Sequence, residues 1–107
     1  MQVVLRGTHV LDIAKLWKRG DLYQVSITRP EMVELLRAYD NKEAMIVVEG
    51  IPFKGKPKYE TPKRGHPYIR IFLPKKLNVI WSRLHETTNK VKVEIIIEDK
   101  GTVGGEV

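Results

Sequence analysis

The chain has 107 residues, of which 42% are hydrophobic, and no cysteine. This length suits one domain, and the lack of cysteine excludes disulfides, cysteine-ligated zinc and thiol catalysis. The 19 basic and 13 acidic residues give a formal net charge of +6, which favours an anionic partner such as nucleic acid, although solubility explains such a charge equally well.

A sequence rich in Lys and Glu and without cysteine is typical of thermophile proteins. No apolar run approaches the roughly 20 residues of a membrane span and no leader pattern appears, so we expect a cytoplasmic protein with no membrane partner.

The N-terminal region begins with a short apolar run, residues 2–5, that predicts a first strand. Residues 9–18 fit two structures. As a helix, this segment places Val10, Ile13 and Trp17 on one face; as a strand, it places Ile13 and Trp17 on one face. We favour the strand slightly, and the helix stays open.

A turn follows at Gly20 and Asp21, because glycine tolerates positive φ and aspartate can bond its own backbone. If residues 9–18 are a strand, a hairpin across Gly20 pairs them with residues 23–28, where apolar side chains alternate.

The next element is a helix that begins at Pro30, with Thr28 as its expected N-cap. Turn residues end it near Tyr39. Residues 44–49 then predict a strand that is apolar on both faces and therefore central in its sheet.

Residues 50–67 interrupt this pattern with prolines and glycines. Prolines exclude a helix or a central strand, so we expect an exposed, semi-stiff arm. Its basic residues are Lys54, Lys56, Lys58, Lys63 and Arg64. The aromatic residues Phe53, Tyr59 and Tyr68 flank these charges and could stack on unpaired bases.

The C-terminal region predicts a strand from Tyr68 that stops at Pro74, a helix over residues 75–85 and a strand over residues 90–98. Trp81 is expected in the core because apolar residues share its helical face. The β-branched last strand would be hazardous at an exposed edge, which favours burial or a homodimer. A frayed tail is expected over residues 100–107.

The two strand–proline–helix–strand segments form an internal repeat, the first feature to seek in a sequence. Aligned on Pro30 and Pro74, the matching positions are Val25 with Ile69, Ile27 with Ile71, Val33 with Leu77 and Leu36 with Ile80. We therefore predict a single domain with a first unit over about 9–50, an arm over 51–67 and a second unit over about 68–99. The expected fold class is α+β and β-rich, a small barrel of two similar strand–helix–strand units.

Two motifs carry a resemblance to a known family. The first runs from Lys15 through Gly20-Asp21 to Val25-Ser-Ile27, and the second is Phe72-Leu-Pro-Lys-Lys-Leu77. Together they resemble the AbrB-like (SpoVT/AbrB, MazE) swapped-hairpin family and its relatives among the cradle-loop barrels. The sequence departs from that pattern where Pro30 comes two residues late. It departs again where Arg64-Gly-His-Pro67 replaces the second Gly-Asn/Asp turn.

The resemblance implies a barrel closed by two units and DNA binding by basic hairpin loops. Closure would come from a homodimer or from an internal pseudo-dimer. Carried onto this sequence, the contacts fall on Lys15, Lys18 and Arg19 in the first unit, and on the 54–64 loop and Arg70 in the second.

The expected function is therefore a small nucleic-acid-binding protein, a DNA-binding regulator or antitoxin-like factor that contacts phosphates through basic loops. DNA is favoured over RNA. The candidate residues are Lys15, Lys18, Arg19, Lys54, Lys56, Lys58, Lys63, Arg64 and Arg70. Alternatives stay open: the arm is only a solvated loop, or it docks on a protein partner as an extended proline-rich segment. An enzyme acting on a nucleotide or sugar phosphate is a further alternative, which rests only on the barrel analogy.

Residues suited to catalysis or metal binding show no matching pattern. His9, His66 and His85 lack ligand spacing. Ser26 and Ser82 have no nearby base in the sequence. We therefore expect a non-enzymatic protein without a metal or cofactor.

Overall fold

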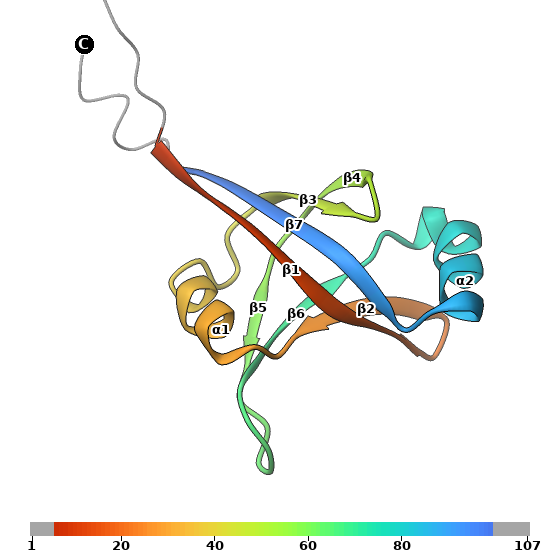
Figure 1. Ribbon diagram of the computed structural model, residues 1–107, viewed down its shortest axis with the longest axis horizontal. Helices are drawn as coiled ribbons and strands as arrows, with labels where there is room; N and C mark the ends of the chain where they lie inside the picture. Colours follow the sequence, from red (N-terminus) through yellow and green to blue (C-terminus); the bar gives the residue numbers. More distant parts are fainter. Residues whose placement is uncertain (1–5, 100–107) are drawn as a thin grey trace, which may run out of the picture.

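The fold is a β-rich α+β structure, in which one antiparallel sheet of seven strands curls into a half-barrel with two helices (Figure 1). The computed structural model describes residues 6–99. The elements are β1 (Arg6–Arg19), β2 (Leu22–Ile27), α1 (Pro30–Arg37), β3 (Ala44–Val48), β4 (Ile51–Gly55), β5 (Lys58–Glu60), β6 (Tyr68–Phe72), a 3-10 turn η1 (Lys75–Leu77), α2 (Asn78–Thr87) and β7 (Lys90–Asp99). The sheet order is β4-β3-β7-β1-β2-β6-β5. This confirms the expected α+β, β-rich class, but the sheet is a half-barrel with β4 and β5 as its edges. The strand predicted over residues 2–5 and the tail over 100–107 lie outside the described residues.

The central strand β1 settles the choice between helix and strand for residues 9–18. It pairs with β7 from Arg6 to Lys15 and with β2 from Lys15 to Arg19. Gly20 forms the turn between β1 and β2 with φ of 64°, a conformation that glycine adopts without steric cost. The predicted hairpin is confirmed.

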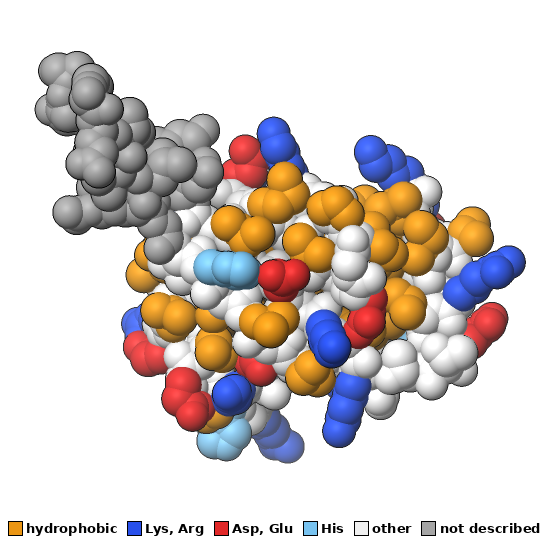
Figure 2. All heavy atoms as spheres, turned by 45° about the horizontal axis from the view of Figure 1, so that its top comes forward, with side chains coloured by type: hydrophobic (Ala, Val, Ile, Leu, Met, Phe, Trp, Pro, Cys, Tyr) orange, Lys and Arg blue, Asp and Glu red, His pale blue; other side chains and the backbone are white. Residues whose placement is uncertain are grey.

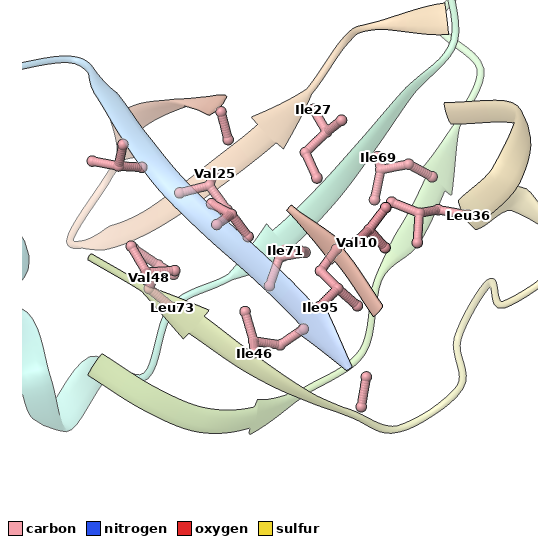
Figure 3. Packing of buried hydrophobic residues seen from close by; sticks show 14 of the residues in the cluster. Val10, Val25, Ile27, Leu36, Ile46, Val48, Ile69, Ile71, Leu73 and Ile95 are labelled. Carbon is pink, nitrogen blue, oxygen red and sulfur yellow. The ribbon is translucent and has the colours of Figure 1, made fainter. Parts of the chain in front are cut away.

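The hydrophobic core lies inside the curl of the sheet, where side chains of β1, β2, β3, β6 and β7 meet (Figure 3). β1, β3, β6 and β7 bury alternate residues, since successive side chains point to opposite faces, whereas β2 buries every residue from Tyr23 to Ile27. The helices lie at opposite ends of the sheet and close it, α1 through Val33 and Leu36 and α2 through Trp81. The Trp81 indole N–H donates to the Pro74 carbonyl at 3.0 Å, so the prediction of a core tryptophan is confirmed.

The expected exposed arm is wrong for residues 51–55 and 58–60, which are the edge strands β4 and β5. Pro52 lies opposite Val47 in β4, and Pro57 is buried. Proline is excluded only from central strands, since an edge strand leaves one row of N–H groups without a ladder partner. Residues 61–67 do form an exposed loop, which projects from the body of the protein (Figure 1).

The helices differ from the sequence prediction at their starts. Arg29, not Thr28, is the N-cap of α1, and it makes no side-chain capping bond. The second helix opens with η1, which changes which residues face inward. Trp81 is fully buried while Ile80 is 37% exposed, so the alignment of Ile80 with the buried Leu36 is wrong.

Strand pairing is reciprocal between the N- and C-terminal parts of the chain. In β2 and β6, Val25 pairs with Ile71 and Ile27 with Ile69, so the pairing is centred on Ser26 and Arg70. Strands β3 and β7 also pair antiparallel. The helices follow the same rule, since α1 lies against β6 and α2 against β2.

Neither helix within residues 6–99 has the length and apolar character needed to cross a bilayer. Both helices are short and amphipathic, and each buries one or two residues. Their role in the described part of the chain is to cover the ends of the sheet.

Candidate nucleic-acid interface

A row of basic side chains crosses the outer face of the sheet, the face that points away from the core. Strand register places Lys90 opposite Lys15, Lys15 opposite Ser26, Ser26 opposite Arg70 and Arg70 opposite Lys58. We call these four cations, together with the buried Ser26 between them, the basic row. Adjacent strands lie about 4.8 Å apart, so the row extends roughly 19 Å along the curled sheet.

The members of the basic row differ in how free their charges are. Lys15 and Lys90 are exposed and form no ion pair among the described residues. The Arg70 side chain is only 19% exposed and is ion-paired with Glu60. Lys58 donates from Nζ to the Asn41 side-chain oxygen. The end of the row at β7 and β1 is therefore the part that can neutralise phosphates without losing a partner.

A second row, which we call the aromatic row, runs beside the basic row on the same face. It contains Trp17 opposite Gln24 and Gln24 opposite Phe72. Phe72 is 41% exposed, and the Arg70 guanidinium lies 4.5 Å from its ring centroid. Tyr68 shares this face of β6, because residues two apart on a strand point the same way.

The prediction that Phe53, Tyr59 and Tyr68 flank the basic charges is only partly correct. Phe53 packs on the core with its ring edge-on to Trp81, and Tyr59 packs on the core beneath Arg37. Tyr68 does lie on the outer face. Phe72 was missed, although burial of the alternate residues in this strand places it opposite the core.

None of the remaining predicted cations joins the basic row. Lys18 lies 5.8 Å from the Tyr23 ring centroid, next to α2, and Arg19 is exposed where β1 ends. Lys63 and Arg64 are exposed in the 61–67 loop. These four cations therefore lie in or near the turns that connect strands of the sheet.

Lys54 and Lys56 are also exposed, but they belong to another part of the sheet. Lys54 pairs with Met45 in β4 and β3, and β3 and β7 separate β4 from β1 in the strand order. The structure thus does not gather the predicted arm into one basic surface.

The outer face of β1, β7 and β3 is largely apolar. Leu11 is 59% exposed, Ile13 54% and Met45 38%, and Figure 2 shows hydrophobic side chains gathered on the side where β1 and β7 lie in front. The expectation that residues 44–49 form an interior strand is confirmed, since β3 lies between β4 and β7, although its outer face is exposed at Met45. His9 Nε2 and Glu94 Oε2 lie within hydrogen-bonding distance, 2.8 Å apart, in this area.

A cleft of about 800 Å³ lies between the β1–β2 hairpin and α2. Its lining includes Lys18, Asp21, Arg83 and Glu86, so both signs of charge are present. Lys75 donates to Asp21 at 3.1 Å. This hydrogen bond, together with the charge of Lys75, lowers the pKa of the Asp21 carboxyl below its ordinary value of 3.8. These charges balance one another and do not form a basic site.

Within residues 6–99, no three histidine, aspartate or glutamate side chains gather in a way that could hold a metal ion. Comparisons with protein-family models, curated proteins and solved structures found no match. The candidate interface therefore rests on register, exposure and charge in this chain alone.

Proposed function

We propose that this protein binds nucleic acid through the outer face of β7, β1, β2 and β6. The basic row supports this proposal most directly, because it aligns cations from strands that are distant in the sequence. Cations so placed bind phosphates and release counterions, which gives affinity without dependence on sequence. We propose a non-enzymatic, cytoplasmic DNA-binding regulator or antitoxin-like factor, with DNA favoured over RNA.

We also propose that the two strand–helix–strand segments are copies of one unit, arranged as an internal pseudo-dimer of the AbrB-like or cradle-loop type. The reciprocal register of β2 and β6 about Ser26 and Arg70 supports this, since a twofold axis between copies produces such a pairing. The matching contacts of α1 with β6 and α2 with β2 support it further. In this arrangement the proposed axis passes through the middle of the basic row.

The first test is the salt dependence of binding to duplex and single-stranded DNA. A protein with Lys15 and Lys90 both replaced by alanine loses two phosphate contacts. The slope of log affinity against log salt should then fall by about 1.8 for duplex DNA and about 1.4 for a single strand. Fluorescence anisotropy over a series of salt concentrations measures this slope.

The matched control replaces Lys76 and Arg83 with alanine. These residues are exposed at η1 and α2, and their loss removes the same charge without touching the basic row. An equal fall in slope for the control would show a nonspecific charge effect. Absence of binding even at low salt would refute the proposed function.

A protein-interaction module is the second candidate, and the apolar outer area around Leu11 and Ile13 favours it. The proline-rich arm no longer supports it, because residues 51–55 and 58–60 are strands of the sheet. The same titrations separate the candidates, since a module that docks only on protein would show no salt-dependent affinity for nucleic acid.

A further inference from the structure

Gln24 is an unusual residue for the centre of this sheet. It is 0% exposed, and neither its side-chain nitrogen nor its side-chain oxygen has a hydrogen-bond partner among the described residues. A buried amide without partners destabilises a fold, whereas an apolar side chain of similar size does not. The indole nitrogen of Trp17, which lies opposite Gln24, is likewise buried without a partner. The fold thus retains polar groups that its own hydrogen bonding does not use.

Aromatic rings on the same face of the sheet as Gln24 are a second feature typical of a ligand-binding site. Phe72 is 41% exposed on a β-strand, and the Arg70 guanidinium lies over its ring. Tyr68 lies on the same face of β6, four residues from Phe72 and about 13 Å along the strand, with Arg70 between them. Aromatic rings backed by cations are the usual platform for unpaired bases, because every base has a π face that can stack.

We infer, on the basis of the proposed function, that the aromatic row is a base-binding site and that the ligand is a single-stranded nucleic acid. A base stacks on Phe72 beside Trp17, and the adjoining phosphates lie on the basic row. Duplex DNA cannot use this site, because the faces of its bases are covered by stacking within the helix.

Gln24 supplies base discrimination at this site. Its amide carries two N–H donors and a carbonyl acceptor, which can hydrogen-bond a base edge. In the free protein the amide is buried, with Trp17 and Phe72 as its neighbours in the strand register, so a base reaches it only when a neighbouring side chain moves. The considerable exposure of Phe72 makes it the ring that can move.

The experiment titrates the full chain with labelled oligo(dA), oligo(dT) and a duplex of the same length. We expect tighter binding of the single strands. Phe72→Ala should weaken single-strand affinity by about 5- to 150-fold, the range for loss of one stacking partner, and leave the duplex affinity and the salt slope unchanged. Phe72→Leu should behave like Phe72→Ala, which separates loss of the ring from loss of apolar bulk. The control Val79→Ala removes an apolar residue of α2 that is 70% exposed and should change neither affinity.

Gln24→Met tests the amide. We expect its thermal unfolding midpoint to rise, because a buried group without partners is removed, while the affinity difference between oligo(dA) and oligo(dT) shrinks. A lower midpoint with unchanged discrimination would refute the role of Gln24.

The outcomes distinguish this inference from the function on which it rests. If duplex and single strands bind equally and Phe72→Ala has no effect, the base-binding site is wrong and the phosphate-binding function stands. If no oligonucleotide binds at low salt, the proposed function fails and this inference fails with it.

Discussion

Asp21 connects two elements that are distant in the sequence. Its carboxylate accepts a hydrogen bond from Lys75, and its backbone carbonyl accepts one from the Asn78 side chain at 2.9 Å. The tip of the β1–β2 hairpin is thereby attached to the start of the second helical segment. The lowered pKa of Asp21 is the measurable sign of this attachment.

The contact between Lys75 and Asp21 predicts a pH-dependent contribution to the free energy of unfolding. Because the pKa of Asp21 is lower in the folded protein, the contribution is present above the ordinary pKa of 3.8. It is lost as the pH falls through the folded-state pKa. Asp21→Asn should therefore be less stable than the wild type at pH 7, and the difference should be smaller at pH 2. Urea unfolding at both pH values measures this difference.

Lys75→Met provides the control, since it removes the partner and leaves the carboxyl group in place. In that variant the Asp21 carboxyl, followed by NMR, should titrate closer to 3.8. A deficit of Asp21→Asn that is as large at pH 2 as at pH 7 would mean that the carboxylate charge is not responsible.

At the scale of elements, the edge strand β5 is protected by the turn after α1. The Tyr59 N–H donates to Asp40 Oδ1 at 2.8 Å, and the Asn41 N–H donates to the Pro57 carbonyl at 2.7 Å. An edge strand otherwise presents free N–H groups that invite pairing with another chain. The turn thus satisfies backbone groups that the short β5 cannot satisfy in the sheet.

Asp40→Ala should expose this edge. We expect faster hydrogen exchange at the Tyr59 amide and a loss of about 1 kcal/mol in the free energy of unfolding, as for one hydrogen bond. Glu43→Ala is the control, since Glu43 is exposed in the same connection. Unchanged exchange at Tyr59 in Asp40→Ala would show that another group protects β5.

The elements that could be predicted are those with strong local patterns. The β1–β2 hairpin follows from alternation and a glycine turn, and α1 from its proline start and apolar spacing. The strands β4 and β5 could not be predicted, because their composition suits a loop and their structure depends on pairing with distant partners. Strand preference depends on such surroundings more than helix preference does.

The candidate interface was predictable only in part for the same reason. Lys15, Lys58 and Arg70 could be singled out as basic residues, but their alignment depends on the register of four strands. Lys90 was not singled out, because nothing near it in the sequence indicates that it lies opposite Lys15. The composition of the chain thus favours an anionic partner. Which residues form the contacting surface follows only from the pairing of strands.

For the whole molecule, the strand order makes the two halves interdependent. The last strand, β7, lies between β3 and β1 of the first half, and β6 lies beside β2. Buried residues of both halves form one hydrophobic cluster. Since β6 and β7 pair with strands of the first half, neither half can bury its apolar face without the other.

We therefore predict a single cooperative unfolding transition. In Trp17→Phe, Trp81 is the remaining tryptophan, and its fluorescence should change at the same urea concentration as the far-UV circular dichroism. Ile46→Val in β3 and Ile95→Val in β7 remove a buried methylene from each half. Each should cost about 0.5–1.5 kcal/mol and shift both signals together, because the two strands pair in one sheet. Two separate transitions, or a shift of only one signal in either variant, would show that the halves unfold independently.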